Sequence, residues 1–377
     1  MNDFYDLTLP REIRFRTGAA EELPALLPDY AKNILFIAGN HALKSGDANE
    51  ISDILRKAEK NVILISGVPP EPAPAEVDKL IKAGRDAQAD AVVALGGGSV
   101  IDAAKAAAAL IPAEGWCQEY FSGAKKITAK GLFFAALPAS AGTGAEMTSN
   151  SVLTDPATMI KQSLRSPFMV ADAALVDPAY TCSASPYLTA CCGLDAFVQA
   201  AEAYTSTRAN SFSSSLALTA LKKIAHALPL AYKDGSDMVA RTEQAEGSML
   251  TGIAFAQCGL GAIHGLAHPC GSLLTIPHGA ACAILMTPVF RFNAETCPEP
   301  YAEMARALSL GDTAEDFVSF AANLAKELGI PSSMKQYGLK EEHFEFIVKN
   351  CRSGSMKSNP RFMSDDDVRK ILTAMMA

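Results

Sequence analysis

Short apolar runs alternate with helical patterns through the first half of the sequence, and this alternation constrains the fold more than any other feature. The runs NILFIA and NVILIS have no polar alternation, which is typical of strands buried on both faces of a sheet. Strands are predicted at residues 12–15, 33–38, 61–66 and 132–137, and helices at 19–27, 48–59 and from about 75 to 89. This order favours βαβ units, right-handed crossovers and a parallel sheet.

The pattern changes at about residue 181, after which long helical segments dominate. Helices are predicted at residues 211–228, 237–255, 300–308, 313–328 and 365–376. With 377 residues, 49% of them hydrophobic, the chain can form two sizeable cores. The sequence therefore predicts an α/β, Rossmann-like domain at residues 1–180 and an all-α domain at residues 181–377.

Composition narrows the class of partner. The net charge of −8 and the lack of a dense Lys/Arg run argue against a nucleic acid or an anionic membrane, and favour small-molecule ligands. The N-terminus lacks the pattern of a signal peptide, and no apolar run approaches membrane-spanning length, so a cytoplasmic protein is expected. The nine cysteines include no C-x-x-C pair, which indicates reduced thiols.

A strand, three glycines and an Ala-rich helix follow one another in residues 90–106. Without Cβ atoms, Gly96, Gly97 and Gly98 let the backbone approach a ligand, and the free amides at a helix start favour a phosphate. Ser99 and Asp102 have the spacing of a capping box, so a capped turn without a ligand is the alternative. The pattern is not G-x-G-x-x-G, and a standard dinucleotide fold does not follow from it.

A second loop of small and hydroxylated residues, at 138–150, follows the strand predicted at 132–137. Open α/β sheets bind ligands at the carboxyl edge, where this loop should lie. Ser140, Thr143 and Asn150 offer neutral hydrogen bonds to a phosphate or an amide there. An ordinary connection between elements is the alternative.

Three of the six histidines, His264, His268 and His278, fall within residues 261–279. His264 and His268 would share one face of a helix, which we expect to end near residue 267 because Pro269 follows. Converging imidazoles in an apolar setting suit a divalent transition metal, whereas each histidine alone could be a hydrogen-bonded core residue. Cys270 is expected to line the pocket rather than to act as a nucleophile.

Asp195 and Gln199, also four residues apart among apolar neighbours, strengthen the metal hypothesis. A buried carboxylate requires a cation or several hydrogen-bond donors. A second helix therefore offers an oxygen ligand to the same ion.

Four separated motifs together resemble the iron-containing alcohol dehydrogenases, and their order and spacing match over nearly the whole chain. They are residues 96–105, residues 138–146 with Asp155 following, residues 193–195, and residues 261–269 with His278 and Gly279. The resemblance extends to residues 173–178, 327–331 and 359–361.

This resemblance implies a dehydroquinate synthase-like fold, in which an N-terminal domain binds NAD or NADP, a helical domain holds a divalent metal, and a cleft lies between them. It implies hydride transfer between the cofactor and a small alcohol or aldehyde, in a homodimer or larger assembly. The matching metal ligands are Asp195, Gln199, His264 and His278. His268 corresponds to a pocket histidine near the metal, and Phe255, like Cys270, would line the substrate pocket. The matching cofactor positions are Gly97, Gly98, Ser99, Asp102, Ser140, Thr143, Asn150 and Lys161.

The sequence departs from the family pattern at two positions. Gln199 stands where the family usually has histidine, and offers an amide oxygen or leaves the position to water, so zinc suits the site as well as iron. Gly39 stands where NAD-preferring members carry an aspartate that repels a 2′-phosphate. Its loss makes NADP acceptable, although Glu71 could restore some acidity.

A bound divalent cation lowers the pKa of coordinated water to about 7, and an alcohol should respond similarly. His268 is the candidate for passing the proton to solvent, with a hydrogen bond that only positions a ligand as the alternative. One rival function is a metal- and NAD-dependent cyclase or lyase like dehydroquinate synthase, which would need more basic residues. The other is a metal- and nucleotide-binding protein without turnover, with Gln199 as a sign of decay.

Overall fold

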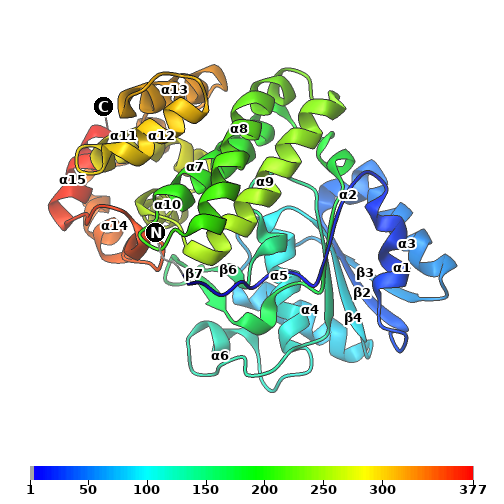
Figure 1. Ribbon diagram of the computed structural model, residues 1–377. Coiled ribbons are helices and arrows are strands. Elements are labelled where there is room, and N and C mark those ends of the chain that lie inside the picture. The colour runs from blue at the N-terminus through cyan, green and yellow to red at the C-terminus, as the bar shows by residue number, and fades with distance from the viewer. Residues whose placement is uncertain (1–3, 377) are drawn as a thin grey trace. The chain divides into compact units, whose positions relative to one another are not determined.

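The computed structural model describes residues 4–376. They form two compact units (Figure 1). One unit spans Thr8–Ser183, and the other runs from Ala184 onward and includes the described residues before Thr8. The first is an α/β unit with a parallel sheet and the second is helical, so the predicted fold class is confirmed.

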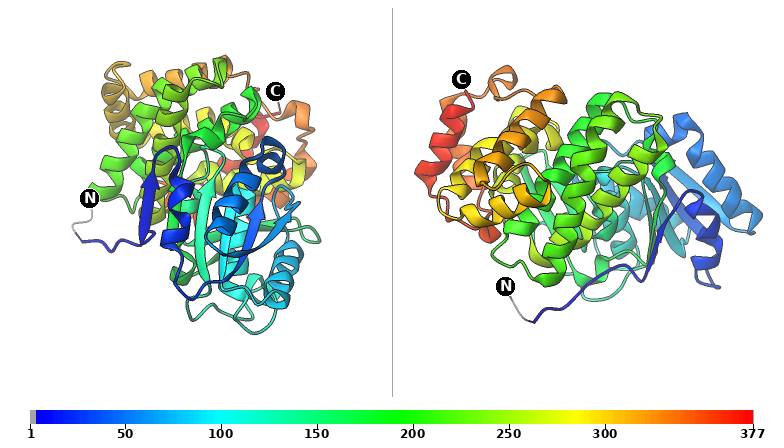
Figure 2. Two further views of the ribbon diagram at one scale, coloured as in Figure 1. Left: turned by 90° about the vertical axis from the view of Figure 1, so that its right-hand side faces the viewer. Right: turned by 45° about the horizontal axis from the view of Figure 1, so that its top comes forward.

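The sheet of the first unit has six parallel strands in the order β1-β8-β5-β4-β2-β3 (Figures 1 and 2). The strands are β1 (Glu12–Phe15), β2 (Asn33–Ala38), β3 (Asn61–Ser66), β4 (Ala91–Gly96), β5 (Phe133–Pro138) and β8 (Ala173–Val176). Ala38 pairs with Leu95, and Gly96 pairs with Pro138. The carboxyl ends of β2, β4 and β5 therefore lie level at one edge of the sheet.

Helices cover both faces of this sheet because successive side chains of a strand point to opposite faces. Leu35 and Ile37 pack in a cluster with α4 (Pro74–Asp86) and α5 (Gly98–Leu110). Ile34 and Phe36 pack on the other face with η1 (Ala19–Glu22), α1 (Leu23–Leu26) and α3 (Asp47–Lys57). Burial on both faces explains why β2 and β4 are continuous apolar runs.

Some local predictions were wrong or incomplete. The helix expected at residues 19–27 is a 3₁₀ turn followed by a single α-helical turn, η1 and α1. The antiparallel hairpin of β6 (Asn150–Asp155) and β7 (Ile160–Arg165) was not predicted. Its strands are rich in polar residues, so no apolar run marks them. The short helices α2 (Asn40–Ser45) and α6 (Cys117–Phe121) were also not predicted.

The helical unit is built around one large apolar core. Phe197, Phe290, Tyr301 and Phe317 pack ring against ring at its centre, with centroids 5.5–6.0 Å apart. The helices are α7 (Pro186–Thr205), α8 (Ser211–Lys233), α9 (Met238–Cys258), α10 (Ala262–Leu274), α11 (His278–Ala294), α12 (Pro298–Ala307), α13 (Ala314–Glu327), α14 (Phe344–Asn350) and α15 (Asp365–Ala374).

Helix α10 does not end near residue 267, so that prediction was wrong. It continues through Pro269 to Leu274, where Thr275 adopts a left-handed conformation. Proline removes one backbone hydrogen bond and crowds the carbonyl four residues earlier. The packing of α10 against α11 and α14 outweighs this local penalty, since Leu266, Cys270 and their neighbours are buried in the core.

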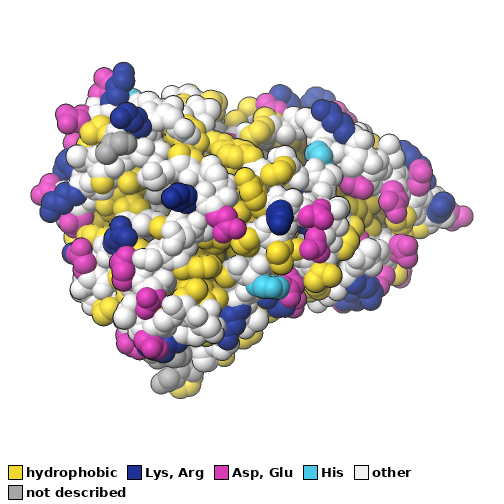
Figure 3. All heavy atoms as spheres, turned by 90° about the horizontal axis from the view of Figure 1, so that it is seen from above, with side chains coloured by type: hydrophobic (Ala, Val, Ile, Leu, Met, Phe, Trp, Pro, Cys, Tyr) yellow, Lys and Arg dark blue, Asp and Glu magenta, His cyan; other side chains and the backbone are white. Residues whose placement is uncertain are grey.

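Acidic and basic side chains are interspersed on the face of the molecule shown in Figure 3. Exposed ion pairs, such as the one between Arg291 and Glu315, contribute little to stability. Within residues 4–376, no single helix is long and apolar enough to cross a membrane, although α9 and α10, bent by 104° at their junction, pass that length and composition test as a pair.

Candidate metal centre and cofactor site

Helix α7 carries three buried polar side chains on one face. Asp195, Gln199 and Glu202 occupy positions i, i+4 and i+7, and each is only 2–3% exposed. That spacing places them in a row along the helix. Two buried carboxylates are costly unless donors or a cation offset their charge.

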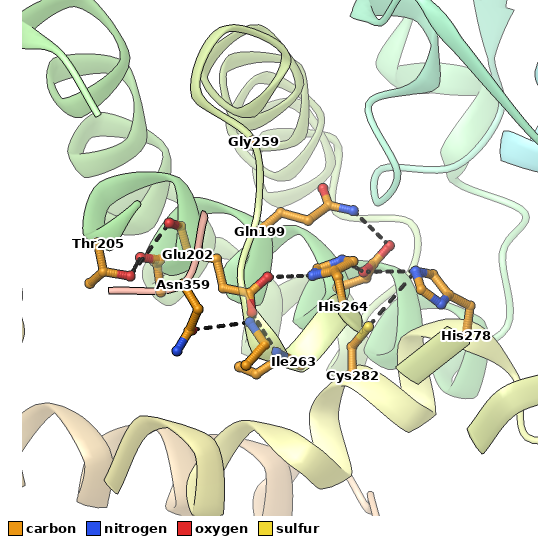
Figure 4. Close-up of polar contacts among 12 residues, drawn as sticks. Gln199, Glu202, Thr205, Gly259, Ile263, His264, His278, Cys282 and Asn359 are labelled. Carbon is orange, nitrogen blue, oxygen red and sulfur yellow. Dashed lines mark hydrogen bonds and ion pairs between the residues drawn. The ribbon is translucent and has the colours of Figure 1, made fainter. Parts of the chain in front are cut away.

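Glu202 hydrogen-bonds to the start of α10 and to His264, the first of the three histidines (Figure 4). Its Oε1 accepts a hydrogen bond from the backbone N–H of Ile263 at 2.7 Å, and its Oε2 lies 2.6 Å from Nδ1 of His264. A carboxylate can only accept, so Nδ1 carries the proton and Nε2 is left for another partner. His264 Nε2 lies 3.2 Å from Oδ1 of Asp195.

The glycine that precedes α10 leaves room for this contact. A Cβ atom on Gly261 would lie 2.7 Å from Oε1 of Glu202 and 3.0 Å from Oδ1 of Asn359. Asn359 accepts from the N–H of Ala262 at 3.1 Å. Side chains from α7 and from the C-terminal part of the chain therefore satisfy the amides that α10 leaves open at its start.

Helix α11 brings His278 and Cys282, which are four residues apart on one face (Figure 4). His278 Nε2 lies 3.7 Å from Oδ1 of Asp195 and 3.8 Å from Sγ of Cys282. A Cβ atom on Gly279 would lie 2.2 Å from the carbonyl oxygen of Cys191. Only glycine lets the start of α11 lie this close to the backbone of α7.

Ligand atoms of Asp195, His264, His278 and Cys282 all lie within 4.8 Å of one another. One carboxylate oxygen, two imidazole nitrogens and one sulfur form a donor set that suits a divalent transition metal. Gln199 Nε2 donates to Oδ2 of Asp195 at 3.0 Å. Among residues 4–376, its buried Oε1 is one of the few side-chain oxygens without a hydrogen-bond partner. The residues therefore fit a metal ion.

The electrostatics of this cluster also favour a cation. Burial alone lowers the pKa of His264, but Cys282, Glu202 and Asp195 outweigh it and hold that pKa well above its ordinary value. Burial raises the pKa of the Cys282 thiol to about 12, against the opposing effect of His264. The carboxylates of Glu202 and Asp195 stabilise positive charge at His264, and they would stabilise a metal ion bound beside it in the same way.

The remaining predicted residues of the helical unit lie in different surroundings. His268 is half-buried, with its ring centroid 5.5 Å from that of His278. Phe255 packs with Ala203, Ala254 and other residues of a small satellite cluster. Cys270 is fully buried in the main core, where burial raises its pKa, so it is an unreactive thiol.

In the α/β unit, the three-glycine turn joins β4 to α5 at the carboxyl edge of the sheet. A Cβ atom on Gly98 would lie 2.7 Å from Oγ1 of Thr143, and one on Gly97 would lie 3.3 Å from Oγ of Ser140. The turn and the loop after β5 are thus in close contact. Gly39, after β2, donates its N–H to the carbonyl of Leu95 at 2.8 Å.

The alternative interpretation of this turn, a capping box made by Ser99 and Asp102, is not what the structure has. Gly97 occupies the N-cap position, and no side chain caps the helix. Ser99 Oγ instead accepts from the N–H of Glu71 at 3.2 Å, and Asp102 Oδ2 accepts from the N–H of Val152 at 3.0 Å. The first amides of α5 are therefore left for other acceptors, which suits a phosphate.

Asn150 and Lys161 lie on the hairpin that follows this loop. Buried Lys105 donates to the carbonyl of Asn150 at 2.8 Å and lies 3.7 Å from Oδ1 of Asp102, so the hairpin is tied to α5. Burial raises the pKa of Asp102 and lowers that of Lys105. Lys161 Nζ pairs with Oε1 of Glu71 at 2.6 Å.

Sequence reasoning missed Glu202 and Cys282. Both follow a proposed ligand at helical spacing, Glu202 seven residues after Asp195 and Cys282 four residues after His278. Applying that spacing to every proposed ligand would have found both. For Cys282, this inference also requires a helix that begins at His278, as α11 does.

Comparisons with known proteins agree along the whole chain. A family model described as iron-containing alcohol dehydrogenase matches residues 10–178, and one for the C-terminal part of the Fe-containing alcohol dehydrogenase family matches residues 189–376. An NADPH-dependent butanol dehydrogenase of Clostridium saccharobutylicum is 35% identical, over 97% of this chain and 96% of that protein.

Solved structures also match this chain over nearly its whole length. A 1,3-propanediol oxidoreductase superposes with a TM-score of 0.93 at 29% identity, covering 99% of this chain and all of the other. A sulfoacetaldehyde reductase from Bifidobacterium kashiwanohense, in complex with NAD+, superposes with a TM-score of 0.92 at 28% identity over the full length of both chains.

The substitution Glu202→Gln should weaken metal binding by roughly 10–100-fold. An amide lacks the negative charge of the carboxylate, and that charge orients His264 and makes the lone pair of its Nε2 a stronger metal ligand. Competition with a chromophoric chelator measures the affinity. The matched control is Glu243→Gln, since Glu243 lies 2.7 Å from Nδ1 of His226 in an exposed pair on other helices. Equal affinities in wild type and Glu202→Gln would show that this contact does not support the site.

Proposed function

We propose that this chain, which belongs to the iron-containing alcohol dehydrogenase family, holds its divalent metal on Asp195, His264 and His278. The protein is a metal-dependent oxidoreductase that interconverts alcohols and aldehydes with a nicotinamide cofactor. The observation that supports this ligand set is the convergence of one carboxylate and two imidazoles from α7, α10 and α11 on a common point.

A divalent cation held by Asp195, His264 and His278 would supply Lewis-acid chemistry, lowering the pKa of an alcohol substrate or polarising a carbonyl. The protein's own residues prepare the site for it. Glu202 fixes the proton of His264 on Nδ1, and Gln199 holds Oδ2 of Asp195 so that Oδ1 faces the two imidazoles. The fourth position is open to an oxygen of Gln199, to water, or to another side chain.

In the α/β unit, the turn at Gly97 and Gly98 would bind the pyrophosphate of the cofactor through its backbone amides. Ser140, Thr143 and Asn150 would add neutral hydrogen bonds, while Ser99, Asp102 and Lys161 would shape the surrounding loops. The proximity of Gly98 to Thr143 and of Gly97 to Ser140 supports this assignment. Rigid elements on both sides of the turn would position the cofactor for transfer.

The substrate is proposed to be a short alcohol or aldehyde. Three of the similar proteins, a butanol dehydrogenase, a 1,3-propanediol oxidoreductase and a sulfoacetaldehyde reductase, are named for substrates with short carbon chains. Another, from Geobacillus thermodenitrificans, is named a long-chain-alcohol dehydrogenase, so these names support an alcohol or aldehyde substrate but not its chain length. Phe255 and Cys270 remain proposed lining residues of the substrate pocket. A homodimer or larger assembly and a cytoplasmic location remain predictions.

The rival functions have less support. A cyclase or lyase of the dehydroquinate synthase type is not favoured, since both family models that match are those of the alcohol dehydrogenases. A binding protein without turnover would require a degraded metal site. The intact contacts of Asp195, His264 and Glu202 argue against such decay.

Removing the metal should abolish activity, and restoring it should return activity. The protein is treated with a chelator, reloaded with Zn²⁺ or Fe²⁺, and mixed with NADPH or NADH and a panel of short aldehydes, while the absorbance of the reduced nicotinamide is followed. The control variant Asp195→Asn should lose both metal and turnover. If the loaded protein binds cofactor yet consumes none with any aldehyde, the function without turnover is favoured.

His268 is proposed to pass the substrate proton to solvent, because it is half-buried beside His278. General acid–base catalysis typically contributes about 10²–10⁴-fold. His268→Gln should therefore lower kcat by about that factor and flatten the pH profile of kcat near neutrality, with the metal content unchanged. A normal pH profile combined with reduced metal content would instead assign His268 to positioning a ligand.

NADP is proposed to be accepted as well as NAD. Gly39 provides no negative charge after β2, and the carboxylate of Glu71 is paired with Lys161, so neither residue presents an uncompensated charge to a 2′-phosphate. The similar butanol dehydrogenase is named as NADPH-dependent. The lack of negative charge at these residues and the name of this similar protein both support the acceptance of NADP.

Gly39→Asp should shift the ratio of kcat/KM for NADPH over NADH toward NADH by at least about tenfold, equivalent to about 1.4 kcal/mol. The site tolerates a side chain, since its φ of −65° is ordinary and the nearest atoms to an added Cβ lie at 3.6–3.7 Å. Ala129→Asp, which adds the same charge in an exposed loop before β5, is the control. An unchanged ratio in Gly39→Asp would show that the 2′-hydroxyl of the cofactor does not lie near residue 39.

A further inference from the structure

The fourth position of the metal centre has two possible protein donors, Gln199 and Cys282. Gln199 stands where the family usually has histidine, but its Nε2 faces Asp195 and donates a hydrogen bond to Oδ2 at 3.0 Å. An amide nitrogen has no available lone pair and does not bind a metal. Figure 4 shows the Oε1 of Gln199 on the side away from this hydrogen bond.

Cys282 is placed differently. It lies one helical turn after His278 on α11, and its Sγ is 3.8 Å from Nε2 of His278. The same sulfur lies within 4.8 Å of the ligand atoms of Asp195 and His264. The side chain is fully buried, so the sulfur faces the cluster rather than solvent.

We infer that Cys282 coordinates the metal as a thiolate, taking the position of the family's missing histidine, and that this softer donor set shifts the preference of the site toward zinc. This inference rests on the proposed metal centre. Gln199 then has a positioning role, since it holds Asp195 without touching the ion. A coordinating cation displaces the thiol proton to solvent.

The observed separations suit a tetrahedral ion. Bonds of about 2.0 Å to nitrogen or oxygen and about 2.3 Å to sulfur separate ligand atoms by roughly 3.3–3.6 Å around a tetrahedral zinc. Asp195 Oδ1 lies 3.2 Å from His264 Nε2 and 3.7 Å from His278 Nε2, and the sulfur lies 3.8 Å from the latter. These three separations lie within about half an ångström of the tetrahedral values, and the remaining ones are at most 4.8 Å.

The choice of metal follows from the donors. Soft thiolate ligands favour ions such as Zn²⁺, whereas carboxylate, carbonyl and water ligands suit harder ions such as Mg²⁺ and Mn²⁺. A substrate oxygen would enter as a fifth ligand, an expansion that zinc allows. The anionic sulfur also offsets part of the ion's positive charge, so Cys282 would moderate how strongly the site polarises a substrate.

Cobalt substitution tests this inference without relying on turnover. The purified full-length protein is stripped of metal and loaded with one equivalent of Co²⁺, and its absorption spectrum is recorded. A thiolate ligand gives a sulfur-to-cobalt charge-transfer band in the near ultraviolet, which histidine, carboxylate and amide ligands do not give. We expect this band in the wild-type protein and in Gln199→Ala.

Cys282→Ser should lose the band and bind Zn²⁺ at least on the order of 100-fold more weakly, since the loss of a residue that only supports a ligand already costs about 10–100-fold. The matched control is Cys351→Ser, which also removes a fully buried thiol of the helical unit but one outside the cluster. It should keep both the band and the affinity. Should Cys282→Ser fail to fold, Cys282→Ala takes its place in the same measurement, and absence of the band from the wild-type spectrum would still refute the inference.

The outcomes separate the two proposals. Wild-type protein that binds one Co²⁺ and reduces aldehydes but shows no charge-transfer band would overturn the role of Cys282 and leave the proposed function in place. A protein that binds no Co²⁺ and has no activity with any metal would overturn both. Persistence of the band in Cys282→Ser would assign it to another cysteine and also refute the inference.

Discussion

The hydrogen bonds that Glu202 accepts from the start of α10 are the constraint on which the metal centre depends. One buried carboxylate accepts from the backbone of Ile263 and from Nδ1 of His264, so it sets the position of a helix and the tautomer of its histidine together. Burial makes these contacts stronger than they would be in water. The Nε2 of His264 faces Asp195 as a consequence of this arrangement.

Three helices contribute side chains to the metal centre, and the same spacing of four residues recurs on each of them. Each contributes polar side chains four residues apart, with Asp195 and Gln199 on α7, His264 and His268 on α10, and His278 and Cys282 on α11. Small residues let the helices approach closely, as Gly261 and Gly279 show. A dense apolar core on the outer sides of these helices then holds the polar faces together, because separating them would expose that core to water.

In the α/β unit, a different feature, the pairing of parallel strands, positions the loops. Parallel pairing brings the carboxyl ends of β2, β4 and β5 level, so the loops that follow them gather at one edge of the sheet. Gly98 allows the turn after β4 to contact Thr143 in the loop after β5. Buried Lys105 then ties the later hairpin to α5 through the carbonyl of Asn150. These loops are thus positioned by strand pairing together with the side chains of Thr143 and Lys105.

The sequence by itself determined the strands β1, β2 and β3 residue by residue, the change to helices in the second half, and most of the polar residues of the centre. These features depend on local periodicity, which is readable from neighbouring residues. Only the tertiary structure decided that α10 runs through Pro269, that α11 begins at His278, that Ser99 does not cap α5, and that Glu202 and Cys282 lie in the cluster. Each of these depends on contacts between segments far apart in the chain, where packing outweighs a local preference.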